Sequence, residues 1–175
     1  MTTPVAAKAL IAELEQEAAS TRKLLERVPA DKLSWKPHAR SMTIGQLAHH
    51  VAGIPGYVSK LARSDGFDVA ARAGVEPAHP ENAAGLLPRL EESLADARAF
   101  LSGLDEESAS APWRLSHGER EVFTVPRLGV VRTMMLNHWY HHRGQLTVYL
   151  RLLDVPVPAV YGRSADETTL APNAS

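Results

Sequence analysis

The sequence predicts an all-α protein, a four-helix bundle with long crossing connections. Apolar residues recur at steps of three and four in four separate stretches of roughly 20 residues, which is the spacing of one face of a helix. The stretches are joined by roughly 14 to 22 residues, more than the two to eight usual in bundles. Connections of this length permit a non-sequential topology, and they can build a site at one end of the bundle.

The first two helices are marked by both their stripes and their boundaries. Pro29 ends the first one. Thr43, three residues before Gln46, fits a capping box that opens the second. Pro55 lies inside this second helix and predicts a kink near residues 51–54. The two apolar stripes contain Leu10, Leu14, Ala18, Thr21, Leu25 and Val28, and Ile44, Leu47, Val51, Ile54, Val58 and Leu61.

The second half of the chain repeats this pattern. A third helix is predicted around Leu87–Leu104, and a fourth from about Arg127 to Leu153. Residues 122–125 have a weak signal for a short extended piece. We expect residues 1–162 to form a single domain, and residues 163–175, which are small and polar, to be a flexible tail.

The composition excludes several classes of protein. The 175 residues include no cysteine, which removes disulfides, thiolate metal sites and a cysteine nucleophile. A net charge of −1 argues against a nucleic-acid partner. No apolar run reaches the ~20 residues that span a bilayer, and no signal peptide is evident, so we expect a cytoplasmic protein without a membrane partner.

Histidines are the most informative residues. At about 100° per residue, His50 lies at the inner edge of the second helical stripe, whereas His49 faces outward. His138 and His142 fall in the middle of the predicted core-facing stripe of the fourth helix, one turn apart. Buried imidazoles need partners, and these could be water, Gln145 or Tyr149, or a divalent metal held by His50, His138 and His142 together.

Several stretches resemble the DinB-like family (DinB/YfiT-like) of proposed metal-dependent enzymes. They are residues 21–29 and 33–38, residues 41–56 with the Leu47-Ala-His-His50 segment, the His138-Trp-Tyr-His-His142-Arg-Gly-Gln-Leu146 block, and Val155-Pro-Val-Pro158 with Tyr161-Gly162. The resemblance covers about residues 8–162, and the stretches occur in the order expected for the family. It implies a four-helix bundle, a homodimer and one divalent metal, zinc or nickel, bound by His50, His138 and His142.

The resemblance also suggests a small-molecule substrate and, in some relatives, a low-molecular-weight thiol. One interpretation is therefore a metal-dependent thiol S-transferase or hydrolase, because three histidines leave a coordination position open. No general base is evident at a fixed spacing, and His141, Gln145 and loop residues such as His38 are candidates. The other interpretation is a non-enzymatic metal-binding or ligand-sensing bundle in a stress response. Trp35 and Trp113 either form a lid or plug the bundle end.

Overall fold

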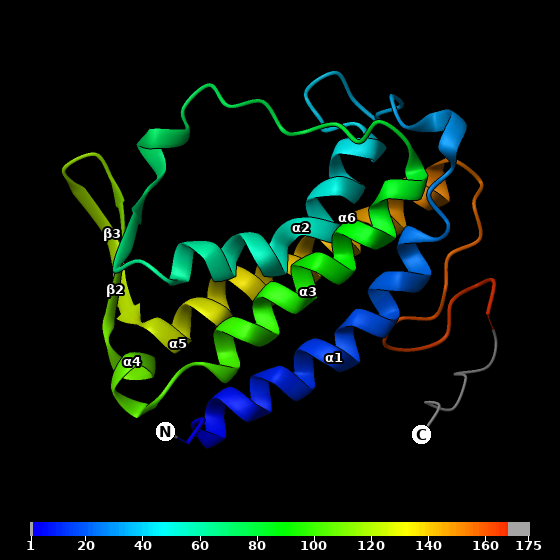
Figure 1. Cartoon of the computed structure of the whole chain (residues 1–175). Coiled ribbons are helices and arrows are strands. Elements are labelled where there is room, and N and C mark those ends of the chain that lie inside the picture. Colours follow the sequence, from blue (N-terminus) through cyan, green and yellow to red (C-terminus); the bar gives the residue numbers. More distant parts are fainter. Residues whose placement is uncertain (1, 168–175) are drawn as a thin grey trace.

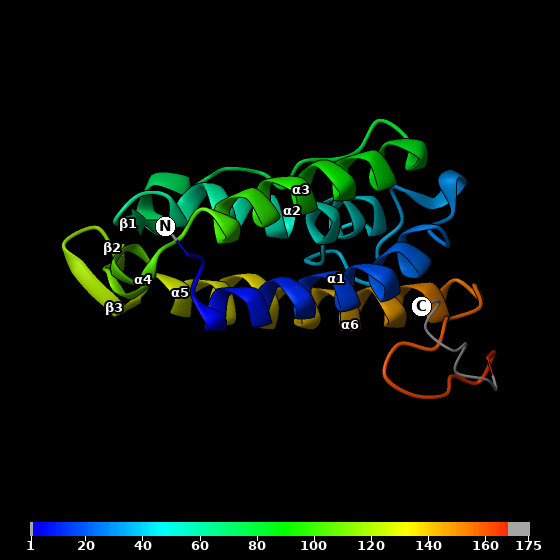
Figure 2. The ribbon, with the colours of Figure 1, turned by 60° about the horizontal axis from the view of Figure 1, so that its bottom comes forward.

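Four long helices form the body of the molecule in a computed structural model that describes residues 2–167 (Figures 1 and 2). Residues 168–175 of the expected tail lie outside the described residues. The first three helices are α1 (Val5–Leu25), α2 (Ile44–Ala62) and α3 (Leu86–Ser102). The fourth consists of α5 (Arg127–Val130), the π-helical segment η4 (Val131–Asn137) and α6 (His138–Leu152).

The helices pack in an order that differs from their order in the chain. Helix α3 contacts both α1 and α2, and α2 also contacts η4 and α6. The 18-residue connection from α1 to α2 includes the short helix η1 (Ala30–Lys32). A predominantly helical bundle with long connections is therefore confirmed. No helix within residues 2–167 is long and apolar enough to cross a lipid bilayer.

A small sheet corrects the all-α prediction. Strands β1 (Gly66–Asp68), β2 (Pro112–His117) and β3 (Arg120–Pro126) lie in that order, with β1 parallel to β2 and β2 antiparallel to β3. Gly118 has a positive φ of 60° and allows the tight turn between β2 and β3. The weak extended signal at residues 122–125 falls within β3. Strand β1 was not predicted, because it is three residues long and pairs with a segment far away in the chain.

The remaining short elements cap the two ends of the bundle. Two lie in the connection from α2 to α3, namely η2 (Val69–Arg72) and η3 (Ala83–Gly85), and α4 (Glu106–Ser110) precedes β2. In Figure 1 the connection from α2 to α3, coloured teal to green, arches over α2. This arch forms one wall of a cavity next to α2.

Helix α2 begins and bends as predicted. The Thr43 hydroxyl accepts from the Gln46 backbone N–H, and the Gln46 side chain accepts from the Thr43 N–H, which completes the capping box. Figure 1 shows a change of direction along α2, which contains Pro55. Proline has no N–H for the carbonyl four residues earlier, that of Val51. The Trp139 indole Nε1–H donates to this carbonyl at 2.8 Å, which joins α6 to the bend.

The fourth helix buries a different face from the one predicted. The side chains of Trp139, Arg143, Leu146 and Leu150 are buried, whereas His138 and His142 are half-buried at the margin of this stripe. A buried arginine is unexpected from the sequence. Arg143 is nevertheless satisfied, because its guanidinium pairs with the buried carboxylate of Glu17 on α1 and donates to the Glu17 carbonyl at 3.0 Å.

Candidate metal centre

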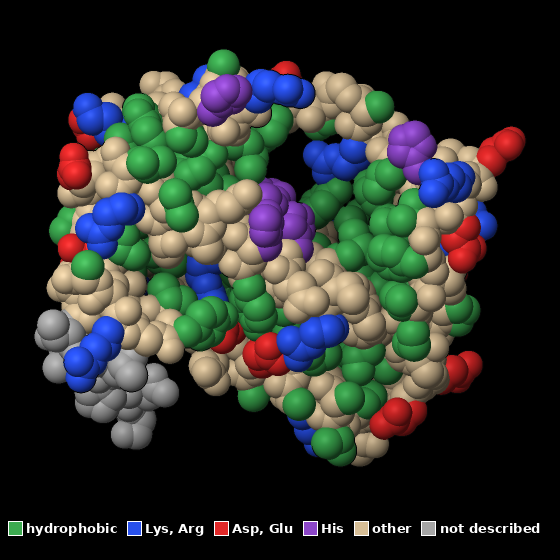
Figure 3. All heavy atoms as spheres, turned by 180° about the vertical axis from the view of Figure 1, so that it is seen from behind, with side chains coloured by type: hydrophobic (Ala, Val, Ile, Leu, Met, Phe, Trp, Pro, Cys, Tyr) green, Lys and Arg blue, Asp and Glu red, His purple; other side chains and the backbone are tan. Residues whose placement is uncertain are grey.

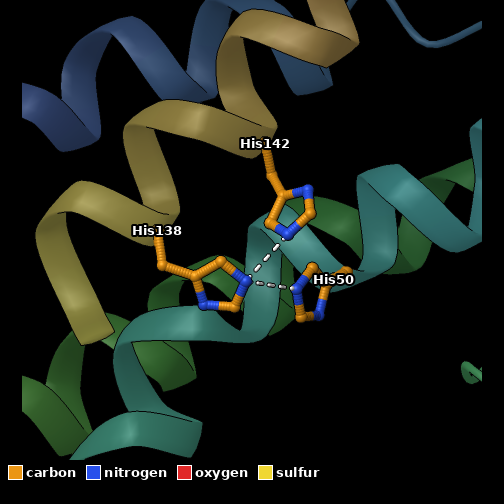
Figure 4. A group of neighbouring side chains, drawn as sticks. All are labelled: His50, His138 and His142. Atoms are coloured by element: carbon orange, nitrogen blue, oxygen red, sulfur yellow. Dashed lines mark hydrogen bonds between the residues drawn. The ribbon is translucent and has the colours of Figure 1, made fainter. Parts of the chain in front are cut away.

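Three histidine side chains from two helices converge on one point (Figure 4). His50 comes from α2, and His138 and His142 come from successive turns of α6. The Nε2 atoms of His138 and His142 are 2.7 Å apart, and the Nε2 atoms of His50 and His138 are 3.4 Å apart. One ligand atom from each residue lies within 4.8 Å of the other two. The predicted convergence of these three histidines is therefore observed.

A hydrogen bond on the outer side of the His142 ring sets which of its nitrogens carries the proton. His142 Nδ1 lies 2.7 Å from Gln145 Oε1, and because this oxygen can only accept, Nδ1 must donate. In the neutral ring, His142 Nε2 is thus left with a free lone pair, which faces His138 Nε2. His138 Nε2 in turn faces both of the other imidazoles.

The surroundings favour neutral imidazoles. Burial, followed by the proximity of His142 and His138, lowers the pKa of His50 to about 4. Burial also lowers the pKa of His138 and His142, although their hydrogen bonds with Met134 and Gln145 act in the opposite direction. Neutral imidazole is the form that binds metals.

The arrangement of donors fits a divalent transition metal. The Nε2 atoms of His138 and His142 face each other at 2.7 Å, so a cation between them would be coordinated by both rings. Zn–N bonds of about 2.0–2.1 Å in tetrahedral geometry separate ligand nitrogens by about 3.3 Å. The His50–His138 spacing of 3.4 Å matches this value, and the His138–His142 pair needs to open only slightly.

The π-helical segment η4 directly precedes His138. Such segments are rare and often occur at functional sites. A π-helix has more residues per turn than an α-helix, so residues 131–137 do not share the angular register of His138 and His142. The predicted stripe assumed a regular helix throughout, which is one reason that it placed the histidines at the centre of the buried face.

A cavity of about 360 Å³ adjoins the histidine cluster. His50, Gly53 and Tyr57 of α2 form one side, and residues 72 and 75–78 of the connection form the other. Arg89 of α3 also lines it. Figure 3 shows an opening beside the purple histidine side chains, bordered by a basic side chain. The site is thus open toward space that can accept an organic molecule.

The other predicted candidates have separate places. His141 is exposed and packs against the ring of His142, with ring centroids 4.9 Å apart. Gln145 orients His142, as described above. His49 is half-buried and lines the cavity, so it does not simply face solvent as predicted.

Neither tryptophan of the connections lines the cavity. Trp113 is completely buried, and its Nε1–H donates to the Leu61 carbonyl at 3.3 Å. It therefore plugs the bundle end rather than forming a lid. Trp35 packs edge-on against Tyr149, with ring centroids 5.9 Å apart.

Sequence reasoning missed Arg72 and Arg89, which line the cavity. Arg72 ends η2 in the long connection, and Arg89 lies near the start of α3. Nothing in their local sequence distinguishes them from solvated arginines. The packing of α3 on α2 brings Arg89 to the cavity beside His50, and the folding of the connection over α2 brings Arg72 there.

Comparisons with known proteins agree with a helical bundle that carries a candidate three-histidine metal centre. The model of the DinB family matches residues 1–174, and the chain belongs to this family. The uncharacterized protein YrdA of Bacillus subtilis (strain 168) is 26% identical over 157 residues, which cover 87% of this chain and 86% of that protein.

Solved structures with a similar fold include two DinB-like proteins. One, from Bacillus cereus ATCC 10987, has a TM-score of 0.67 and 20% identity and covers 92% of this chain and 100% of its own. The other, YjoA from Bacillus subtilis, has a TM-score of 0.64 and 19% identity, with 89% and 99% covered. At these identities the structures support the fold.

Proposed function

We propose that this DinB-family protein binds one divalent transition metal through the Nε2 atoms of His50, His138 and His142. The observation that carries the proposal is their convergence, with the Nε2 lone pair of His142 left free because its Nδ1–H donates to Gln145. Imidazole ligands suit zinc and nickel, the two metals that we favour.

We further propose that the site is catalytic, of the thiol S-transferase or hydrolase type. Three protein ligands leave at least one coordination position for substrate or water. When bound, the metal supplies Lewis-acid activation of a thiol or of water. The residues of the chain hold the metal and orient its ligands. Gln145 fixes the orientation of the His142 ring, and the cavity beside His50 receives the substrate.

Elemental analysis of protein made without an affinity tag tests metal binding directly. We expect about one equivalent of zinc or nickel, and loss of the metal in the His50→Ala, His138→Ala and His142→Ala variants. His141→Ala is the matched control, because His141 is on the same helix but exposed. Equal metal content in all four variants would contradict the assignment.

Gln145→Ala tests the orienting hydrogen bond separately. Removing the partner of a ligating imidazole typically lowers metal affinity about 10–100-fold. We expect a decrease in this range by competition with a chromogenic chelator. The variant should keep the fold, since Gln145 is exposed.

Turnover distinguishes an enzyme from a metal-binding or ligand-sensing module. Metal-loaded protein is screened with low-molecular-weight thiols and electrophilic or ester substrates, with His138→Ala as the control. Turnover that disappears in this variant supports the enzyme. Metal-dependent melting without turnover on any substrate supports the module instead.

A further inference from the structure

Arg89 is unusual among the arginines of this protein. Within residues 2–167, seven other arginines form an ion pair with a carboxylate: Arg22, Arg27, Arg98, Arg127, Arg132, Arg143 and Arg151. Arg89 is half-buried, yet within residues 2–167 it forms no ion pair with a carboxylate. All other arginines without such a pair in this part of the chain are exposed. Burying part of a guanidinium without a neighbouring anion costs free energy, because the charge loses hydration that nothing replaces.

The backbone of α2 positions this guanidinium at the cavity wall. Arg89 Nε donates to the His49 carbonyl at 3.1 Å, which leaves the two terminal NH₂ groups available. A Cβ atom at Gly53 would overlap the guanidinium, so the glycine allows Arg89 to lie flat against the helix. Gly53, Arg89 and His50 line the same cavity.

The charged residues that line the cavity are mostly basic, with Arg89 on one wall and Arg72 on the other. Arg72, on the opposite wall, donates to the Tyr57 hydroxyl at 2.6 Å. The acidic residue of the lining is Glu76, and it forms no ion pair with either arginine. The cavity is therefore cationic even before a metal adds its own charge.

We infer that the cavity binds a small organic acid, with a carboxylate of the ligand held by the Arg89 guanidinium and its other end directed toward the His50 side. The inference rests on the proposed function and adds the substrate class. Guanidinium matches the planar, two-oxygen geometry of a carboxylate. An anionic ligand offsets both the unpaired arginine and the charge of a metal. A volume of about 360 Å³ suits a small molecule.

The test uses two thiols that differ in one group, 3-mercaptopropionate and 3-mercapto-1-propanol. Both are titrated into Co²⁺-loaded protein, in which thiolate binding gives a charge-transfer absorbance. We expect the carboxylate compound to bind about tenfold more tightly, the effect of one charge-assisted hydrogen-bonded pair. In Arg89→Met, which keeps an apolar stem, the two affinities should become nearly equal.

Controls separate the position of Arg89 from its charge. Arg63→Met removes an exposed arginine outside the cavity and should retain the tenfold ratio. Arg89→Lys keeps the charge but not the planar fork, and should fall between wild type and Arg89→Met. A ratio near one in wild type, or a ratio that Arg89→Met leaves unchanged, would overturn the inference.

Failure of the inference can be told apart from failure of the proposed metal site. The Co²⁺ spectrum before thiol addition reports the metal site alone, and Arg89→Met should leave it in place. Calorimetry of 3-mercaptopropionate with metal-free protein provides a second measurement. Weaker binding that still depends on Arg89 supports the carboxylate site, whereas binding that is independent of Arg89 overturns it.

Discussion

The hydrogen bond from Trp139 to α2 should stabilise the fold more than an ordinary hydrogen bond does, because of Pro55. The proline cannot donate to the Val51 carbonyl, and Val51 and Trp139 are both completely buried. The Trp139 indole donates to this carbonyl at 2.8 Å. Trp139→Phe removes the donor and leaves the carbonyl without its side-chain partner.

The magnitude follows from two contributions. An unsatisfied buried carbonyl costs about 1–3 kcal/mol. The smaller phenyl ring adds about 1–2 kcal/mol for the lost volume. We therefore expect Trp139→Phe to lower the free energy of unfolding by about 2–5 kcal/mol.

Pro55→Ala isolates the hydrogen-bond contribution. Alanine restores an N–H four residues after Val51, so the carbonyl keeps a partner even without the indole. In the Pro55→Ala background, Trp139→Phe should cost only the volume contribution. The double-mutant cycle should then give a coupling of about 1–3 kcal/mol.

Urea unfolding of the four metal-free proteins, followed by circular dichroism, measures the cycle. Costs that add to within about 0.5 kcal/mol would show that the proline and the indole do not share the Val51 carbonyl. Since Val51 and Trp139 each directly follow a histidine of the cluster, Trp139→Phe should also weaken metal binding. Pro55→Ala should partly restore that binding together with the stability.

Three further predictions concern other parts of the molecule. Glu17→Ala leaves the buried Arg143 guanidinium without its carboxylate, and we expect urea unfolding to show a loss of about 3–5 kcal/mol. Burial of its hydroxyl, followed by the hydrogen bond to Glu17, raises the pKa of Tyr161 to about 12. Its protonated hydroxyl should therefore contribute to stability below pH ~10, and this contribution should be lost as the pH rises through about 12. An absorbance titration should show a late-titrating tyrosine that is missing in Tyr161→Phe, and a titration unchanged by that substitution would contradict this. Sedimentation velocity should give a homodimer, and a 19.0 kDa species at high micromolar concentration would reject it.

The sequence alone predicted the parts of the site that depend on local spacing. The capping box at Thr43 and the proline in α2 set where that helix begins and bends, because both act within a few residues. His138 and His142 are four residues apart, so any helix places them on neighbouring turns. The angular position on the helix also distinguished His50 from His49, and the structure brings His50 close to His138 and His142.

Tertiary structure decided which face of the fourth helix is buried and what adjoins the histidines. Trp139 and Arg143 are polar at one end, and each can be buried only because a partner on another helix, the Val51 carbonyl or Glu17, satisfies it. The three-residue strand β1 forms only through pairing with a distant segment. The cavity exists only because the long connection returns over α2 and α3 packs on α2, which brings Arg72 and Arg89 to its walls. Hydrogen-bond and ion-pair partners far apart in the chain leave no periodic signal, because periodicity records only the neighbours within one element.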